Sequence, residues 1–320
     1  MTKSSLRIVY MGTPDFAVCS LRKLVEEGYN VVAVVTMPDK PSGRGHKVQF
    51  SPVKQYALSV GLPVLQPMKL KDELFVEELR SYKADLQIVV AFRMLPEVVW
   101  AMPRLGTFNL HASLLPQYRG AAPINWAVIN GDTQTGITTF FLKHDIDTGD
   151  MILQERTPIA YDENVGSVHD RLMVMGAELV KRTIDLIIEG NVKAVPQPVL
   201  PAEQMRPAPK IFKETCLINF HQPVERVYNF IRGLSPYPTA WCELTLAGEP
   251  ITVKVYSATV YNQDHNDDNT IAAGTVSTDG KHYLRVRCQD GWIELQELQL
   301  AGKKRMTVKD MLNGMHYESA

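Results

Sequence analysis

The chain has 320 residues, of which 45% are hydrophobic, and its 34 lysines and arginines almost balance its 35 aspartates and glutamates. At roughly 100 to 200 residues per domain, this length predicts two domains, each with enough apolar side chains for its own core. The composition excludes an intrinsically disordered chain. Because the net charge is close to zero, any contact with nucleic acid must come from local clusters of basic residues.

The cysteines and the N-terminus indicate the compartment. The four cysteines are widely separated and form no C-x-x-C pair, which excludes a zinc knuckle and a disulfide framework: Cys19, Cys216, Cys242 and Cys288. Residues 1–7 contain no apolar core of signal-peptide length, and no apolar run reaches the ~18 residues of a membrane-spanning helix. We therefore expect a cytoplasmic protein with reduced thiols and no contact with a membrane. We also expect a monomer.

Short apolar runs alternate with helical patterns over residues 1–190. The runs read as strands at 6–11, 31–36, 63–65, 86–91, 107–111, 137–142 and 151–154. Amphipathic spacing predicts helices near 16–25, 53–60, 74–79, 96–101 and 168–188, and Ser51-Pro52 has the pattern of an N-cap followed by proline at the first helical position. Continuously apolar strands between helices predict an α/β domain with a doubly wound, mostly parallel, Rossmann-like sheet.

The pattern changes in residues 191–209, where five prolines predict a semi-rigid linker. Residues 210–320 then contain one helical pattern, at 224–231, followed by alternating runs at 240–246, 251–260, 272–276, 283–287 and 292–298. These runs predict a small C-terminal β-barrel domain, similar to an oligonucleotide-binding (OB) fold.

Asn109 and His111 stand two residues apart at the end of a predicted strand, so both side chains face the same side of the sheet. Open α/β sheets bind ligands at the carboxyl ends of their strands. An isolated N-x-H is more often a turn cap and a core histidine. The sequence that follows favours a ligand site instead. Prolines and small residues there form a stiff loop that lets a flat ligand approach the backbone: S-L-L-P at 113–116 and R-G-A-A-P at 119–123.

Two other motif matches carry little weight. Gly43-x-Gly45 lacks the third glycine of a dinucleotide fingerprint and precedes no helix directly. Asp145-x-Asp147-x-x-Asp150 is not a calcium loop, because Asp150 stands where that loop needs glycine. We predict no metal site.

The segment 108–126, FNLHASLLPQYRGAAPINW, together with a later D-x-G turn at Asp147, resembles the formyltransferases that use 10-formyltetrahydrofolate. Within this superfamily the sequence is most similar to the methionyl-tRNA formyltransferases, through M-G-T-P-D-F-A at 11–17, S-P-V-K at 51–54 and A-G-K-K at 301–304. The resemblance spans nearly the whole chain. It departs from the family at A-F-R-M-L-P, 91–96, where an A-Y-G turn is common, and at Asn125-Trp126.

The resemblance implies a role for particular residues. Asn109 would stabilise the oxyanion of formyl transfer, His111 would act as a second donor or proton carrier, and Asp147 would orient the imidazole and help to take the amine proton. The residues that would line the folate site are Ser113, Leu114, Leu115, Pro116, Phe92, Arg93 and Leu95. The implied co-substrate is 10-formyltetrahydrofolate, and the implied partner is initiator methionyl-tRNA.

Basic residues give the chain candidate RNA contacts. The loop 36–50 is rich in glycine, proline and cations, and by resemblance it enters the acceptor stem of the tRNA, although by itself it reads as a solvated loop. The residues predicted to contact nucleic acid are Arg44, Lys47, Lys210, Lys303 and Lys304. The β-barrel domain would then be the tRNA-binding domain.

Two alternatives remain open from the sequence. S-L-L-P-x-Y-R-G is shared with formyltransferases that act on nucleotide-linked aminosugars, but neither the C-terminal domain nor the basic loop has an obvious task with a small phosphorylated amine. A non-catalytic RNA-binding protein on the same scaffold is the second alternative, and the presence of Asn109, His111 and Asp147 together disfavours it.

Overall fold

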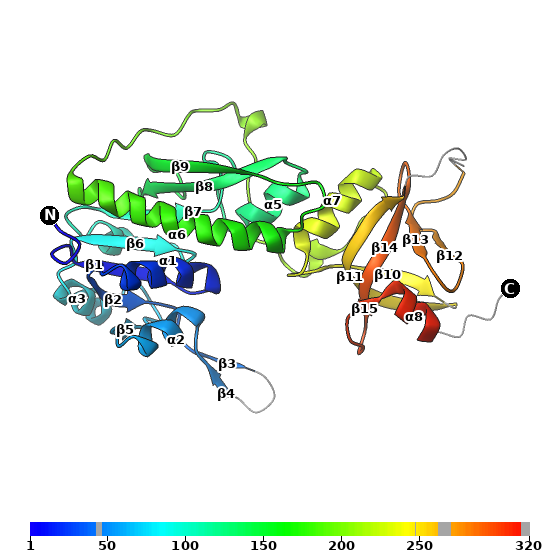
Figure 1. Ribbon diagram of the computed structural model, residues 1–320, viewed down its shortest axis with the longest axis horizontal. Helices are drawn as coiled ribbons and strands as arrows, with labels where there is room; N and C mark the ends of the chain where they lie inside the picture. The colour runs from blue at the N-terminus through cyan, green and yellow to red at the C-terminus, as the bar shows by residue number, and fades with distance from the viewer. Residues whose placement is uncertain (43–46, 247, 262–269, 315–320) are drawn as a thin grey trace. The chain divides into compact units, whose positions relative to one another are not determined.

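The computed structural model describes the chain except residues 43–46, 247, 262–269 and 315–320. Two compact units emerge from the contacts within the chain (Figure 1). The first comprises 1–123, 135–157 and 169–207, and the second comprises 124–134, 158–168 and 208–320. A single cut in the sequence therefore does not separate them, because 124–134 and 158–168, which lie within residues 1–190, belong to the second unit.

The first unit contains a seven-stranded sheet in the order β5-β2-β1-β6-β7-β8-β9. Strands β5, β2, β1, β6 and β7 run parallel to one another, and β8 is antiparallel to β7. The bounds are β1 Ile8–Gly12, β2 Val31–Val35, β5 Val64–Leu65, β6 Leu86–Val90, β7 Thr107–His111, β8 Gln134–Phe141 and β9 Met151–Pro158. The predicted doubly wound, mostly parallel sheet is confirmed.

Local sequence explains the helices of this unit. Ser51 caps α2, with its Oγ accepting from the Lys54 backbone N–H at 3.1 Å, and Asp72 caps α3 in the same way. The bounds are α1 Asp15–Glu26, α2 Pro52–Ser59, α3 Glu73–Ser81, α4 Glu97–Trp100 and α6 Val165–Glu189. Apolar side chains of α3, such as Phe75 and Leu79, pack with those of β1, β2 and β6 into one buried cluster.

The strand order places the ends of β1 and β6 at a switch point. The chain moves from β1 outward to β2 and β5 and then returns to β6 on the other side of β1. Loops after β1 and β6 diverge there, and in such sheets this is where ligands bind. Gly12 ends β1 at a crowded position, since a Cβ there would lie 2.6 Å from the Ala17 Cβ and 2.9 Å from the Val90 carbonyl oxygen.

The second unit is an antiparallel half-barrel with helices α5 (Pro123–Ile129), α7 (Val224–Leu234) and α8 (Val308–Gly314). Its sheet has the order β10-β11-β14-β13-β12, and β15 pairs with β14. A register shift between Val255 and Ala258 introduces a bulge in β11, which bends the strand. The bounds are β10 Ala240–Leu246, β11 Glu249–Tyr261, β12 Val276–Thr278, β13 Leu284–Arg287, β14 Trp292–Leu300 and β15 Met306–Thr307.

The predicted C-terminal β domain is confirmed, but several element bounds were wrong or missing. The run at 272–276 is not a strand, since the Thr275 N–H bonds the Ala272 carbonyl in a turn and β12 begins at Val276. Helices α5 and α8 and the hairpin of β3 (Lys40–Ser42) and β4 (Lys47–Gln49) were not predicted, because such short elements carry too few residues for a clear period. Two short 3-10 turns, at Ala202–Gln204 and Glu214–Cys216, complete the described elements.

No helix among the described residues has both the length and the apolar composition that crossing a membrane requires.

The α2 cap gives a direct test of the local folding argument. We expect Ser51→Ala to lower the free energy of unfolding of the first unit by about 1 kcal/mol, because the N-terminal N–H groups of α2 lose an acceptor. Urea unfolding followed by hydrogen exchange in α2 measures this. Ser59→Ala at the exposed end of the same helix is the control, and an equal effect of both substitutions would contradict the capping role.

Candidate active site

The His111 ring is fixed by a backbone carbonyl. His111 ends β7 and is 6% exposed, and its Nε2 lies 2.8 Å from the Tyr118 carbonyl oxygen. A carbonyl only accepts, so Nε2–H is the donor, and in this tautomer the lone pair lies on Nδ1. Asn109, two residues earlier on the same strand, is half-buried between Val89 and Phe140 of the neighbouring strands. Its amide makes no hydrogen bond to any described residue.

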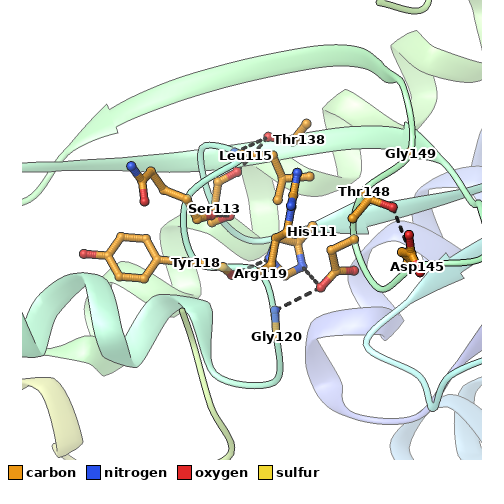
Figure 2. A network of polar contacts seen from close by, with 12 residues as sticks. His111, Ser113, Leu115, Tyr118, Arg119, Gly120, Thr138, Asp145, Thr148 and Gly149 are labelled. Carbon is orange, nitrogen blue, oxygen red and sulfur yellow. Dashed lines mark hydrogen bonds and ion pairs between the residues drawn. The ribbon is translucent and has the colours of Figure 1, made fainter. Parts of the chain in front are cut away.

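Asp147 comes to the same place from the loop between β8 and β9. Its Oδ2 lies 3.9 Å from the His111 Nδ1 and accepts the Gly120 backbone N–H at 3.0 Å. His111 thus lies between the loop with Tyr118 and Gly120 and the loop with Thr148 and Gly149 (Figure 2). At 3.9 Å the two side chains are too far apart for a direct hydrogen bond. Both Nδ1 and Oδ2 can therefore accept a proton from a third group beside them.

Gln197 connects the two loops. Its Nε2 donates to the carbonyl oxygens of Asp147 at 2.7 Å and Gly149 at 2.9 Å, while its Oε1 accepts from Arg119 NH2 at 2.7 Å. The side chain is buried, so all of these groups are protected from competing water. Asp147 has φ +54, a left-handed conformation that aspartate tolerates, and the Gln197 bonds stabilise it there.

Gly149 allows the D-x-G loop to lie against β8. A Cβ on Gly149 would lie 1.6 Å from the Phe141 carbonyl oxygen, so no other residue fits without moving the backbone. The Phe141 N–H bonds the Asp150 carbonyl at 3.0 Å, which holds the same segment to the end of the strand. The glycine of the motif is thus required by packing, two residues after Asp147.

The loop 113–118 is held by hydrogen bonds within itself and to β8. The Ser113 Oγ donates to the Gln117 carbonyl at 2.6 Å, and Thr138 Oγ1 donates to the Ser113 carbonyl at 2.7 Å. Leu115 is buried and joined to Pro116 by a cis peptide bond, and its carbonyl accepts from Gln154 Nε2 at 3.1 Å. Leu114, half-buried, packs over Gly136 of β8. The Ser113 hydroxyl and the Leu115 side chain therefore support the loop from inside.

The segment 204–206 clamps the same loop from outside. The Gln117 side chain donates to the Gln204 carbonyl at 2.8 Å and accepts from the Arg206 N–H at 2.8 Å, and the Tyr118 N–H donates to the Arg206 carbonyl at 2.6 Å. Because the Tyr118 carbonyl fixes His111, this clamp also sets the position of the imidazole.

The predicted folate-lining residues of the 91–96 loop follow β6, beside β7. Arg93 donates to the carbonyls of Pro67 and Met68, which joins this loop to the one after β5. Its Nε is buried without a hydrogen-bond partner among the described residues, and burial lowers the pKa of the guanidinium. Phe92 is half-buried, whereas Leu95 is 7% exposed and belongs to the core cluster. Leu95 therefore supports the loop.

The predicted nucleic-acid contacts lie apart in the chain. Arg44 lies outside the described residues, and Lys47 belongs to β4, where only the backbone is described. Lys210 is exposed in the second unit, with its Nζ 5.3 Å from the centre of the Phe212 ring. Lys303 and Lys304 are exposed in the turn after β14.

Comparison with known proteins decides the family. The model of the formyl transferase family matches residues 6–184, and that of the formyl transferase C-terminal domain matches residues 210–316. A methionyl-tRNA formyltransferase of Bacteroides fragilis is 64% identical over 100% of this chain and 98% of its own length. This chain belongs to the methionyl-tRNA formyltransferase family. A second family member, from Bacteroides thetaiotaomicron, is 63% identical over 98% of this chain and 97% of its own length.

Solved structures share the formyltransferase fold at low sequence identity. An N-formyltransferase from Helicobacter canadensis, in complex with folinic acid and dTDP-3-aminofucose, has a TM-score of 0.65 and 18% identity, covering 94% of this chain and 100% of its own. HypX from Aquifex aeolicus, in complex with tetrahydrofolic acid, has a TM-score of 0.63 and 17% identity, covering 96% of this chain and 47% of its own.

Sequence reasoning missed two parts of the site. Gln197 stands among the prolines of the predicted linker with no motif around it, yet it bonds the Asp147 loop. The carbonyl of Tyr118 and the N–H of Gly120 are backbone groups, which residue identities do not reveal. One signal for this part of the site is present in the sequence, the glycine at position 120, because glycine is favoured where the backbone has a positive φ. In the structure Gly120 has φ +126.

The contact between Gly149 and β8 is testable in this formyltransferase. We expect Gly149→Ala to lower the melting temperature and to displace the Asp147 loop, because the added methyl group overlaps the Phe141 carbonyl. Calorimetry and hydrogen exchange of residues 143–150 measure both effects. Gly314→Ala is the control, because the Cβ it adds lies in open space and Gly314 has no positive φ. Similar melting temperatures for Gly149→Ala and Gly314→Ala would contradict the packing argument.

Proposed function

We propose that this protein transfers the formyl group of 10-formyltetrahydrofolate to the α-amino group of initiator methionyl-tRNA. The observation that carries the proposal is the approach of Asp147 to His111, 3.9 Å apart at the carboxyl end of β7, in a chain 64% identical over its full length to a methionyl-tRNA formyltransferase. The product would be N-formylmethionyl-tRNA, used to initiate translation.

The residues beside the switch point suit a folate co-substrate. Phe92 offers part of an aromatic face, and the buried Arg93 Nε–H has no partner in the described chain. A pterin ring is flat and rich in hydrogen-bond acceptors, so an aromatic face and an unused donor are appropriate neighbours. We assign the folate site to two sets of residues, the side chains of Phe92, Arg93 and Leu114 and the backbone of Ser113, Leu115 and Pro116. Leu95 supports the 91–96 loop from the core.

Asn109 has the chemistry to stabilise the reaction's negative charge. As the amine adds to the formyl carbon, the formyl oxygen becomes an oxyanion, and a pre-positioned amide N–H lowers the barrier. Asn109 sits on the face of β7 that carries His111, and no described group occupies its amide. One such donor contributes about 3 kcal/mol to transition-state stabilisation.

His111 and Asp147 supply the proton route. The Tyr118 carbonyl holds the Nε2 proton, so the Nδ1 lone pair and the Asp147 carboxylate face the reacting amine as acceptors. The amine loses a proton as it adds, and the departing folate nitrogen gains one. In this route the amine proton passes to the Asp147 carboxylate, with the His111 Nδ1 as a second acceptor beside it, and then to the departing folate nitrogen, so no covalent intermediate with the protein is required.

Basic side chains of both units would hold the tRNA. We propose Arg44 and Lys47 for the end of the acceptor stem, and Lys210, Lys303 and Lys304 for backbone phosphates. The exposure of the last three permits such contacts, which position an RNA without reading its sequence.

The catalytic assignment predicts large losses of rate. We expect Asn109→Ala and Asp147→Asn each to lower turnover at least about a hundredfold, because the first removes the oxyanion donor and the second removes the proton acceptor. Formation of formylmethionyl-tRNA from 10-formyltetrahydrofolate measures turnover, and circular dichroism measures folding. A folded variant with nearly normal turnover would exclude that residue from the mechanism. Transfer to a dTDP-aminosugar but not to methionyl-tRNA would overturn the proposed acceptor.

Gln197 provides a test of positioning. We expect Gln197→Glu to lower turnover at least about tenfold with a smaller change in KM for the tRNA, because a carboxylate oxygen replaces the N–H donor opposite the Asp147 and Gly149 carbonyls. The pH profile of turnover should also shift as the Asp147 loop relaxes. The matched control is Gln289→Glu, an exposed side chain with no described hydrogen bond. Equal rates for the two variants would show that Gln197 does not position Asp147.

A further inference from the structure

A pocket of about 340 Å³ lies within the second unit, formed by α5, residues 217–222 and α7. None of its lining residues belongs to the His111 and Asp147 site or to the predicted RNA contacts. Its volume is in the range that holds one small organic group.

The apolar part of the pocket is aromatic and fixed. Trp126 donates its Nε1–H to the Pro209 carbonyl at 2.8 Å, so the half-buried indole cannot rotate freely. Phe230 is half-buried and packs against the core of the second unit. Fixed aromatic rings of this kind stack flat ligands, including nucleobases.

Two asparagine side chains of the pocket present their NH₂ groups as hydrogen-bond donors, because their oxygens already accept hydrogen bonds. The Asn219 Oδ1 accepts the His221 backbone N–H at 3.0 Å, and the Asn229 Oδ1 accepts from Arg232 Nε at 2.7 Å. Both partners can only donate, which fixes which end of each amide is the oxygen. The NH₂ groups of Asn219 and Asn229 therefore remain as the free ends of these side chains.

Arg226 adds a positive charge. It is exposed and has no ion pair with any described residue, whereas the neighbouring Glu225 accepts a hydrogen bond from the Tyr161 hydroxyl at 2.9 Å. Within the described part of the chain, no aspartate or glutamate lines the pocket. This lining is complementary to a ligand with a flat ring, several acceptors and a negative charge.

We propose that this pocket binds a single nucleotide, with its base against Trp126 and Phe230 and its phosphate at Arg226. Asn219 and Asn229 donate to acceptors of the base or the ribose. Such a nucleotide has two sources, an unstacked position of a bound RNA strand or a free mononucleotide. The inference depends on the pocket alone and goes beyond formyl transfer.

Binding measurements on the full-length protein test the proposal without using catalysis. We expect Arg226→Glu to weaken binding of deacylated initiator tRNA about tenfold and to reduce the slope of log K against log salt by roughly 0.7 to 0.9, the value for one lost phosphate contact. Asn229→Asp should also weaken binding several-fold, because it removes the donor yet keeps the acceptor for Arg232. Arg80→Glu, the same charge change at an exposed position on α3, is the control.

Equilibrium dialysis with AMP, CMP, GMP and UMP distinguishes the two sources. Weaker tRNA binding by both variants indicates a nucleotide of the RNA strand, whereas unchanged tRNA binding with lost mononucleotide binding indicates a free nucleotide. Quenching of indole fluorescence by the ligand should be reduced in Trp126→Phe, which keeps an aromatic ring. If Arg226→Glu and Asn229→Asp fold normally and change neither tRNA nor mononucleotide binding more than Arg80→Glu does, the pocket binds no nucleotide.

Discussion

The Asp147 carboxylate and the Gly120 backbone N–H form the contact on which the rest of the site depends. Asp147 belongs to the loop between β8 and β9 and has φ +54. The Gly120 N–H holds the carboxylate, and the Gln197 side chain holds the carbonyls of Asp147 and Gly149. Three segments far apart in the sequence are therefore needed to place one carboxylate beside His111.

A backbone carbonyl fixes the tautomer of His111. The Tyr118 carbonyl determines which imidazole nitrogen carries the proton, and residues 204–206 keep Tyr118 in place through Gln117 and the Arg206 backbone. The side chains that would react are thus held by groups that do not react themselves. This arrangement agrees with a general requirement of catalysis, since donors and acceptors stabilise a transition state only when they need no reorganisation.

Charge in this protein is arranged locally, because the whole chain has a formal net charge of −1. Acidic and basic side chains pair extensively on the surface of the first unit, as Lys23 does with Glu27 and Glu178. Lys210, Lys303 and Arg226 of the second unit have no such ion pair among the described residues. Unpaired cations can contact phosphates without first breaking an existing ion pair.

The sequence by itself determined the elements whose signal is local. Apolar runs predicted the strands of the first unit, and Ser51-Pro52 predicted the start of α2. The resemblance carried by N-x-H and D-x-G implied that Asn109, His111 and Asp147 act together, and the catalytic roles of these residues stay a prediction. Tertiary structure alone decided the strand order β5-β2-β1-β6-β7-β8-β9, which brings the loops after β6, β7 and β8 to one place. It also decided the role of Gln197, which acts on backbone carbonyls 50 and 48 residues away. Hydrogen bonds to backbone groups leave no pattern of residue types in the sequence, so only the three-dimensional structure shows them.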